Sequence, residues 1–416
     1  MHAYRSHTCA DLDKTNVGDT VRLAGWVHRV RDHGGVLFID LRDHYGITQV
    51  LCDSDSPAFA ELEKVRSEWC IRIDGSVKAR DEGLINPKIP TGEIEVIADD
   101  LVVLNRSQTV PFEPDSEEAA KVSEETRLRY RYIDLRRASM ARNLRLRHAI
   151  CQAMRRVLDG MGFTEVETPF LTKSTPEGAR DFLVPSRLQL GDFYALPQSP
   201  QLFKQILMVA GLDKYYQIVR CFRDEDLRAD RQPEFTQLDV EMSFATEVDV
   251  MAMTDAVFRE ICQVAGKGFP EEVPTIPYAQ AMDRYGIDCP DMRFEMLLSD
   301  VSDIVAGSDF KVFSGAIERG GVVKGLCAPG GAKFTRKEID QYTAHAGDFG
   351  AKGLAWCKLE ADGFVGGVAK FLDASTQSSL RERFGAADGD ILMFVADAPE
   401  GANKALAALR SKLGAD

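Results

Sequence analysis

Charged and amide side chains near the middle of the chain have the types and spacing of a site for a ligand that carries both signs of charge. Arg223 and Glu225 are two residues apart, and so are Gln237 and Asp239. Because side chains two apart on a strand point to the same face, each pair is expected to face one way. The arginine can bind an anionic group of a ligand, and the carboxylates can bind a cationic group of the same ligand, both through charge-assisted hydrogen bonds.

A β-hairpin is the element expected to position these groups, because two segments with strand-like alternation flank a charged loop over residues 226–234. The polar row of the second strand consists of Gln237, Asp239, Glu241 and Ser243. Its apolar row, expected to face the core, consists of Leu238, Val240, Met242 and Phe244. A hairpin with one face in water shows the same alternation, so a plain surface hairpin is the alternative.

A second cation is predicted at the start of a helix. Gln201 and Lys204 are three residues apart just after Pro200, and residues at that spacing share one helix face. A helix N-terminus that carries a lysine is a good place for an anion. The alternative is that Lys204 is a solvated surface lysine. The Gly- and Pro-containing loop before this helix, residues 173–185, carries Glu177 as a further candidate.

Residues 1–106 show several short strands with one helix after the third, a pattern typical of a small five-stranded barrel of the OB type. Such barrels bind single-stranded nucleic acid with aromatic platforms and cations. The candidates for that role are Arg29, Arg31, Phe38 and Gln49. From the residues alone, however, a core position is preferred for Phe38, since large aromatic side chains are mostly buried.

Length and composition indicate an ordinary globular protein of two or three domains. The chain has 416 residues, of which 44% are hydrophobic, and no apolar run is long enough to span a membrane. Nine cysteines without metal-type spacing indicate reduced thiols, and with no secretory signal at the start they predict a cytoplasmic location. A net charge of −14 counts against a generic nucleic-acid coat protein. Residues 121–147 nevertheless carry nine Lys or Arg against three acids. This basic stretch is either a phosphate-binding patch or a solvated helix face with structural ion pairs.

Three segments resemble the motifs of a known family. TEVETP at 164–169 is similar to motif 1 of the class II aminoacyl-tRNA synthetases, and CFRDEDLRADRQPEFTQLDVE at 221–241 resembles their motif 2. QSPQLFKQ at 198–205 is similar to the same family. The agreement is closest to the bacterial aspartyl-tRNA synthetases and extends over essentially the whole chain. The resemblance implies a multidomain α+β fold. Its expected parts are an OB-fold anticodon-binding domain (1–106), a hinge (107–139), an antiparallel-sheet catalytic core (140–288) and an α+β insertion domain of the GAD type with a mixed sheet (289–416).

The resemblance also implies an activity: L-aspartate is activated with ATP and Mg²⁺ to aspartyl-adenylate and then transferred to tRNA. Arg223 and Glu225 would be the catalytic residues, and Arg223 would meet both the α-phosphate of ATP and the aspartate carboxylate. The further aspartate-binding residues would be Glu177, Gln201, Lys204, Gln237 and Asp239. The further ATP-binding residues would be Asp224 and Gln232. No protein nucleophile is needed, because positioning and charge stabilisation carry the reaction.

In the same family the barrel binds the anticodon. Phe38 would stack on a base and Gln49 would read one, with Arg29, Arg31 and Glu95 nearby, which reverses the core preference for Phe38. His33 and Gly83 stand where the branch that also charges the asparagine tRNA carries the same residues. The resemblance therefore implies a non-discriminating enzyme whose partners are both tRNA(Asp) and tRNA(Asn).

One departure from the family concerns its third motif, a glycine-flanked arginine that grips ATP. The 416 residues contain no counterpart, so a C-terminal truncation, an incomplete core and an inactive chain are expected. Pro169 lies in the motif 1 segment that forms the family's dimer interface, so a homodimer is expected too. The alternatives are a non-catalytic tRNA-binding or dimerising fragment and an asparaginyl or lysyl relative. In the last domain, His345, Asp348 and Lys352 are interpreted as a solvated helix end.

Overall fold

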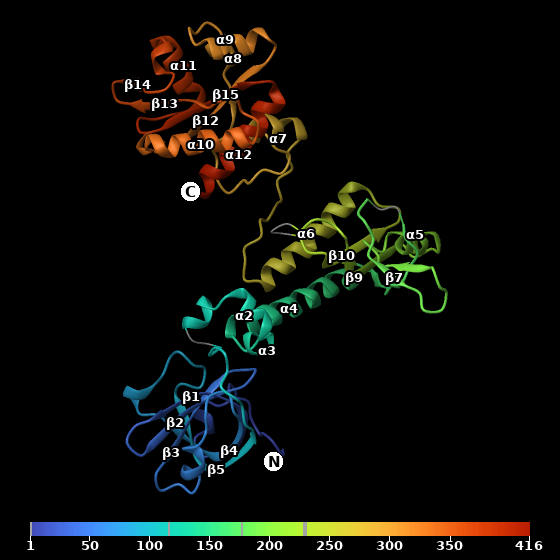
Figure 1. Cartoon of the computed structure of the whole chain (residues 1–416), viewed down its shortest axis with the longest axis vertical. Coiled ribbons are helices and arrows are strands. Elements are labelled where there is room, and N and C mark those ends of the chain that lie inside the picture. The colour runs from blue at the N-terminus through green and yellow to red at the C-terminus, as the bar shows by residue number, and fades with distance from the viewer. Residues whose placement is uncertain (1, 115–116, 176–177, 228–230) are drawn as a thin grey trace. The chain divides into compact units, whose positions relative to one another are not determined.

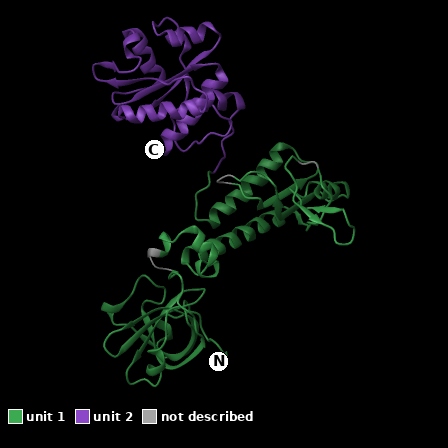
Figure 2. Ribbon diagram, viewed as in Figure 1, with its two compact units in different colours: residues 1–270 green, residues 271–416 purple. Residues whose placement is uncertain are grey.

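The computed structural model describes residues 2–114, 117–175, 178–227 and 231–416 (Figure 1). It divides the chain into two compact units, residues 1–270 and 271–416 (Figure 2). Within the described ranges, every helix is too short or too polar to cross a membrane.

The N-terminal part of unit 1 is a closed five-stranded barrel with the strand order β1-β2-β3-β5-β4. Its strands are β1 (Thr20–Asp32), β2 (Val36–Arg42), β3 (Ile47–Asp53), β4 (Cys70–Ala79) and β5 (Ile94–Asn105), and the short α1 (Phe59–Leu62) follows β3. Alternate side chains fill the interior, as Leu37, Ile39 and Leu41 do on β2. The OB-type barrel predicted from the sequence is thus confirmed.

The hinge after the barrel contains the short helices α2 (Glu124–Arg129) and α3 (Arg131–Asp134). A buried carboxylate joins it to the barrel: Glu68 accepts from Arg42 Nη2 at 2.8 and 2.9 Å and from Arg136 Nη1 at 2.5 Å. The Arg136 guanidinium also stacks over the ring of Trp26, 5.2 Å from its centroid. Part of the basic stretch 121–147 therefore forms structural ion pairs.

The part of unit 1 that follows the hinge is built on a hairpin with two different faces. Strands β9 (Lys214–Phe222) and β10 (Glu234–Met242) are antiparallel, and the two-residue β6 (Thr164–Glu165) pairs with β9. Tyr216 and Leu238 on one face pack with the long helix α4 (Ala138–Gly160) and with α6 (Glu247–Val264). The other face receives α5 (Gln201–Val209), while β7 (Leu183–Pro185) and β8 (Phe193–Ala195) form a separate pair.

Two details of the hairpin differ from the sequence prediction. Leu238, Val240 and Met242 pack toward the core, but Phe244 is 99% exposed and has a positive φ of 52°. The strand ends at Met242, so the two-residue period does not reach Phe244. The first strand likewise ends at Phe222, which leaves Arg223 and Glu225 in the connecting loop rather than on the strand.

Unit 2 is an α+β domain whose five-stranded sheet has the order β11-β12-β15-β13-β14. The strands are β11 (Ser299–Asp300), β12 (Val322–Ala328), β13 (Ala355–Glu360), β14 (Gly363–Val365) and β15 (Ile391–Asp397). All four pairings are antiparallel, so the mixed sheet expected from the sequence is wrong. The helices around the sheet are α7 (Tyr278–Tyr285), α8 (Ser302–Val305), α9 (Lys311–Glu318), α10 (Arg336–Asp348), α11 (Ala374–Phe384) and α12 (Pro399–Ala415).

The sequence predicted that the last domain begins at residue 289, but the second unit of the structure begins at residue 271. Helix α7 packs against α12, and Lys324 of β12 donates to Asp283 Oδ1 at 2.9 Å. Arg410 of α12 is only 2% exposed and donates to the backbone carbonyls of residues 291, 294, 295 and 296. Its guanidinium stacks on Tyr285 and Phe294, 5.0 and 4.2 Å from the ring centroids. These contacts bind residues 278–296 to the second unit.

Candidate active site

The polar face of the β9–β10 hairpin is not open to water, because α5 lies against it. In the antiparallel register Asp239 stands opposite Gln217, and Glu241 stands opposite Tyr215. Tyr215 is fully buried, Gln217 is 6% exposed and Asp239 is 8% exposed. The surface-hairpin alternative is thereby excluded, since buried polar groups of this kind need partners in the protein or a ligand.

Lys204 of α5 reaches into this face and is not a solvated lysine. Its Nζ lies 2.9 Å from Asp239 Oδ1 and 3.3 Å from Glu241 Oε2, and its side chain is 12% exposed. Burial works to lower the pKa of Lys204, but the hydrogen bond and charge of Asp239, with the charge of Glu241, outweigh it and raise the pKa. Burial raises the pKa of Asp239, because one lysine does not offset both its desolvation and the repulsion from Glu241.

Asp239 keeps one oxygen without a partner. Its Oδ2 is buried and has no donor in good hydrogen-bonding geometry among the residues that the structure describes, although the nearby Tyr215 phenol works to lower the pKa of Asp239. The phenol of Tyr215 lies beside it but donates to Gln217 Oε1 at 3.0 Å, and the hydroxyl of Thr168 donates to the same oxygen at 2.9 Å. A buried carboxylate oxygen with no donor is the group that a ligand ammonium would satisfy.

A cavity of about 330 Å³ opens at the loop end of the hairpin. Arg223 starts this loop, its N–H donates to Pro233 O at 2.8 Å, and its guanidinium stacks over Phe235 at 5.0 Å. Glu225 and Gln232 line the same cavity. Its remaining lining residues are Asp226, Leu227, Arg231, Pro233 and Phe235.

Other predicted residues lie around these two sites. Asp224 does not line the cavity; its N–H donates to Arg180 O at 3.0 Å. Gln201 is the first residue of α5, and Pro200 occupies the N-cap. Gln237 Oε1 lies 3.2 Å from Cys221 Sγ, which donates to it. Glu177 lies outside the described residues.

Three residues that the sequence prediction did not single out contribute to these sites. Phe235 and Arg231 line the cavity, and Gln198 donates to Ala179 O at 2.8 Å and to Asp181 Oδ1 at 2.6 Å, which holds the loop before α5. Phe235 could have been found, because it lies two residues before Gln237 and so continues the polar row. Gln198 begins the QSPQLFKQ segment, but its partners are 17 and 19 residues away, and contacts at that range have no local sequence signal.

On the barrel, Phe38 is not a core residue. It is partly exposed, whereas its neighbours Leu37 and Ile39 are buried in the interior. The ring of His33 meets the Phe38 ring edge-on, with centroids 5.5 Å apart. The interpretation of Phe38 as an outward-facing ring therefore fits the structure, and the core preference does not.

A polar network continues the Phe38 surface. Arg31 donates to Asp40 Oδ1 at 2.7 Å and to Gln49 Oε1 at 3.3 Å, and Gln49 donates to Glu95 Oε2 at 3.2 Å. Arg29 is exposed on the same strand as Arg31. Gly83 lies in a 3₁₀ turn (Glu82–Leu84), where an added Cβ would meet nothing within 4 Å.

The sequence matches two family patterns that agree with this fold and site. Residues 123–410 match the tRNA synthetases class II (D, K and N), and residues 21–104 match the OB-fold nucleic acid binding domain. The chain belongs to the class II tRNA synthetases of this group. Members of this class use ATP, and they attach amino acids to tRNA.

Curated relatives place the chain within that class. It is 55% identical to the aspartate–tRNA(Asp/Asn) ligase of Moorella thermoacetica and 52% identical to that of Bacillus subtilis, with 99% of the chain covered in each case. It spans 68% and 70% of the length of these two proteins. Within the class, the chain therefore belongs to the bacterial-type aspartyl-tRNA(Asp/Asn) synthetases.

A solved structure is also similar. Asparaginyl-tRNA synthetase from Pyrococcus horikoshii, in complex with asparaginyl-adenylate, is 25% identical and has a TM-score of 0.55. The match covers 62% of this chain and 57% of that one. Among the described residues, no group of three or more His, Cys, Asp or Glu side chains is placed to hold a metal ion.

Replacing Lys204 should destabilise the hairpin in a pH-dependent way. In Lys204→Met the two carboxylates lose their cation, so the pKa of Asp239 rises further and the folded state takes up a proton more readily than the unfolded state. Stability is then lost as the pH rises and regained as it falls. We expect a loss of about 3 kcal/mol near pH 7 and a smaller one near pH 5.

Hydrogen exchange of the β9 and β10 backbone amides measures this local opening free energy. Lys204→Met combined with Asp239→Asn should recover most of the loss at neutral pH. A loss of equal size at both pH values would contradict the ionic role of Lys204.

Proposed function

We propose that this chain is the aspartate-activating part of an aspartate–tRNA ligase that makes aspartyl-adenylate from L-aspartate and ATP and transfers aspartate to tRNA(Asp) and tRNA(Asn). The observation that carries the proposal is the buried Lys204–Asp239 pair with its unpartnered carboxylate oxygen. A bound aspartate would give its side-chain carboxylate to Lys204 and its ammonium to Asp239. Gln201, Gln237 and Glu177 would complete its binding.

The cavity beside Arg223 fits a nucleotide. Phe235 offers a ring for the adenine, and Arg223 and Arg231 offer charge for the phosphates. Glu225 and Gln232 line the same space and would bind polar atoms of the base or ribose, and Asp224 follows Arg223 in the loop. Mg²⁺, entering with ATP, would neutralise the phosphate charge.

The chemistry proposed for these residues is positioning and charge stabilisation. The aspartate carboxylate oxygen attacks the α-phosphorus, and pyrophosphate leaves with the electrons of the broken P–O bond. Arg223 would meet the extra negative charge at that phosphorus, which is largest in the transition state. Because the 416 residues contain no counterpart of the motif 3 arginine, we expect the chain by itself to bind these ligands but not to complete the reaction.

Two other functions are less well supported. An asparaginyl or lysyl relative would have to use the Lys204–Asp239 pair differently, and the relatives that are 52 to 55% identical are named aspartate ligases. A non-catalytic tRNA-binding or dimerising piece has no use for a buried carboxylate that lacks a donor. Binding of L-aspartate to the chain, absent for L-asparagine and L-lysine, separates these alternatives.

Arg223→Ala should abolish adenylate formation in a chain that carries the full length of its relatives. The measurement is ATP–pyrophosphate exchange with L-aspartate and Mg²⁺. Retention of more than about a tenth of the activity, which is less than about 1.4 kcal/mol of transition-state stabilisation, would refute the role of Arg223. In the 416-residue chain, the same substitution should weaken ATP binding by about tenfold, whereas Arg220→Ala, at an exposed position near the end of β9, should not.

The outward face of the barrel supports recognition of an unpaired anticodon. Phe38 offers a stacking ring, and the network of Arg31, Gln49 and Glu95 offers donors and acceptors for base edges, with Arg29 exposed beside them. His33 meets the Phe38 ring edge-on, and a side chain added at Gly83 would meet nothing within 4 Å. This arrangement suits a site that accepts either third anticodon base.

The chain should therefore bind tRNA(Asp) and tRNA(Asn) transcripts with affinities within about tenfold of each other, a difference of about 1.4 kcal/mol. Filter binding or fluorescence anisotropy measures both. Phe38→Ala should weaken both by about 1–3 kcal/mol, whereas Gly83→Leu should weaken tRNA(Asn) more than tRNA(Asp). Discrimination against tRNA(Asn) by more than about a thousandfold, or about 4 kcal/mol, would contradict relaxed specificity.

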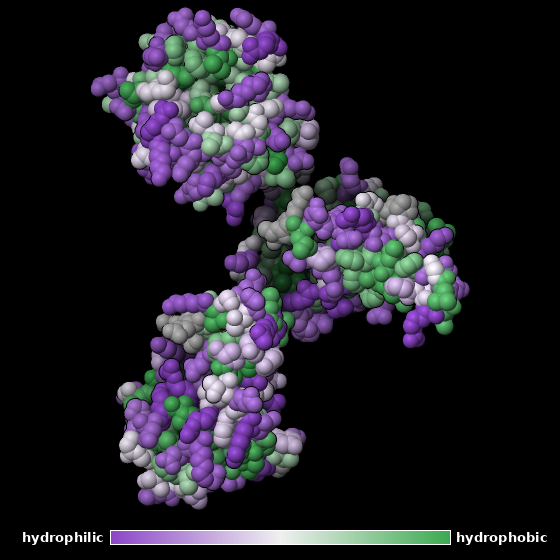
Figure 3. All heavy atoms as spheres, viewed as in Figure 1, coloured by the Kyte–Doolittle hydropathy of each residue, from purple (hydrophilic) through white to green (hydrophobic). Residues whose placement is uncertain are grey.

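A homodimer is the assembly that we propose. Pro169 is exposed, and so are the apolar side chains of Phe170 (44%), Leu171 (55%) and Leu144 on α4 (53%). A cavity of about 420 Å³ on α4 is lined by Leu146, Ile150 and Met154. Figure 3 shows hydrophobic side chains at the surface of this part of unit 1. Exposed apolar side chains in such numbers are typical of a surface that another subunit covers.

Sedimentation velocity should find a species of twice the 46.1 kDa chain mass. Leu144→Glu with Leu171→Glu should raise the dimer dissociation constant by at least about a hundredfold, because two buried charges would lack partners. Leu84→Glu, at a leucine on the barrel that is 66% exposed, serves as the control. A monomer at all concentrations would count against the proposed dimer.

A further inference from the structure

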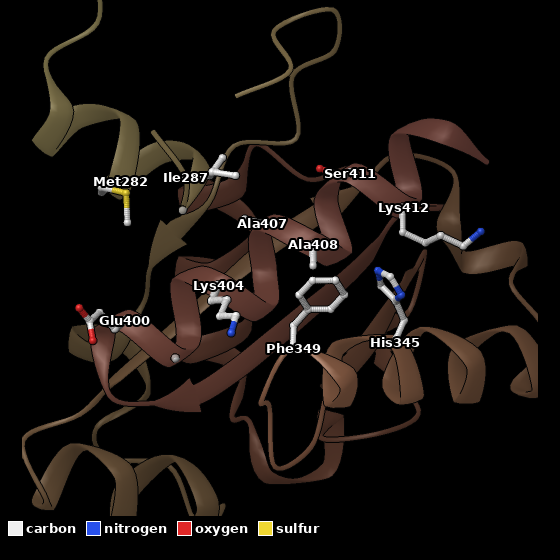
Figure 4. Close-up of a pocket in the computed structure, with 12 residues that line it drawn as sticks. Met282, Ile287, His345, Phe349, Glu400, Lys404, Ala407, Ala408, Ser411 and Lys412 are labelled. Atoms are coloured by element: carbon white, nitrogen blue, oxygen red, sulfur yellow. The ribbon is translucent and has the colours of Figure 1, made fainter. Parts of the chain in front are cut away.

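A groove of about 950 Å³ lies along α12 in unit 2 and carries charges of both signs (Figure 4). Glu400 lines it together with Lys404, and Lys412 donates to Asp416 Oδ1 at 2.9 Å. Among its lining residues, all of them within the described ranges, none has a buried polar side-chain atom without a partner. The polar face of the β9–β10 hairpin differs, because Asp239 Oδ2 is such an atom. The hairpin therefore has a polar group that a ligand would satisfy.

Three neutral side chains form a hydrogen-bonded group beside Asp239. Gln217 of β9 stands opposite Asp239 in the register, and Tyr215, two residues earlier, lies on the same face. The Tyr215 phenol donates to Gln217 Oε1 at 3.0 Å, and the hydroxyl of Thr168 donates to the same oxygen at 2.9 Å. Because Tyr215 and Gln217 are buried, these bonds are made within the protein rather than with water.

Gln217 Oε1 has two donors, and this allows the Tyr215 proton to serve a second acceptor. Each hydroxyl has one proton to donate. Since Thr168 supplies Gln217, the phenol proton can turn to Asp239 without leaving the amide oxygen unpaired. Burial raises the pKa of Asp239, whereas Lys204 and the nearby Tyr215 phenol work to lower it. Burial and the charge of Asp239 raise the pKa of Tyr215, so the phenol keeps its proton at neutral pH.

We propose that Tyr215 and Thr168 are positioning residues that keep Asp239 Oδ2 directed at the α-ammonium of the bound amino acid. This role rests on the proposed function, in which that ammonium binds Asp239. Lys204 holds the other oxygen, Oδ1, at 2.9 Å. A carboxylate held on one side only can rotate about its Cβ–Cγ bond and turn both oxygens to the lysine. The phenol opposes that rotation by donating to Oδ2 until the ammonium arrives, and its proton then returns to Gln217.

A positioning role of this kind affects only ligands that carry an ammonium group. L-Aspartate and succinate have the same two carboxylates, but succinate lacks the ammonium. A distorted hairpin would weaken the binding of both, because both would give a carboxylate to Lys204. Loss of the Asp239 orientation would weaken the binding of L-aspartate alone, so the two ligands separate positioning from a general structural effect.

The test measures the binding of L-aspartate and of succinate to the whole chain by ligand-observed NMR titration. Tyr215→Phe removes only the hydroxyl and should raise the dissociation constant of L-aspartate at least about fivefold, the size of one hydrogen bond, while that of succinate changes by less than about twofold. Thr168→Val, which commits the phenol to Gln217, should weaken L-aspartate about threefold and spare succinate. The double variant should be no weaker than Tyr215→Phe, because Thr168 acts through the phenol.

Tyr216→Phe is the matched control, since it removes the same hydroxyl from the next residue. The Tyr216 phenol donates to Asp159 Oδ1 at 2.8 Å, and its ring packs on the opposite face of the hairpin. This variant should bind L-aspartate within about twofold of the wild-type chain.

An unchanged or tighter L-aspartate constant in Tyr215→Phe, an equal loss for L-aspartate and succinate, or an equal effect of Tyr216→Phe would overturn the role of Tyr215 and leave the proposed function standing. A wild-type chain that binds no L-aspartate would refute the proposed function, and this role with it.

Discussion

The catalytic-core region depends on a hairpin that buries polar groups on one face while its other face builds the hydrophobic core. Tyr216 and Leu238 pack under α4 and α6, so the register of β9 and β10 is fixed by apolar burial. Because a slip by one residue would exchange the faces, that same burial places Asp239 and Gln217 opposite each other. The helix α5 then covers the polar face and brings Lys204 to Asp239. The core thus holds a charged pair that would otherwise be costly to bury.

The sequence predicted the hairpin, its polar row and the lysine, because strand and helix periodicity are local signals. It did not predict that Arg223 lies beyond the end of β9, since a loop and a strand end look alike when charged residues surround both. It also left Phe235 out, although the two-residue period includes it. The hydrogen bond from Thr168 to Gln217 joins residues about 50 positions apart, and no local pattern in the sequence indicates such a contact.

The barrel was predictable for the same reason, since its strands alternate clearly and its turns contain glycine. The sequence alone could not place Phe38, because an aromatic ring on a strand suits either face until the neighbouring rows are known. Because Leu37 and Ile39 fill the barrel interior, Phe38 between them must lie on the outer face. The start of unit 2 was missed because Arg410 and Lys324, which hold residues 278–296, come far later in the chain than the segment they bind.

Glu68 limits how the barrel domain can be exchanged between related proteins. It has a positive φ of 64°, its side chain is wholly buried, and it is shared by Arg42 of the barrel and Arg136 of the hinge. A barrel transplanted from a relative without an acid at this place would leave Arg136 facing Trp26 with no anion to neutralise it. A chimera that joins a foreign barrel to this hinge must therefore carry Arg42, Glu68 and Arg136 together.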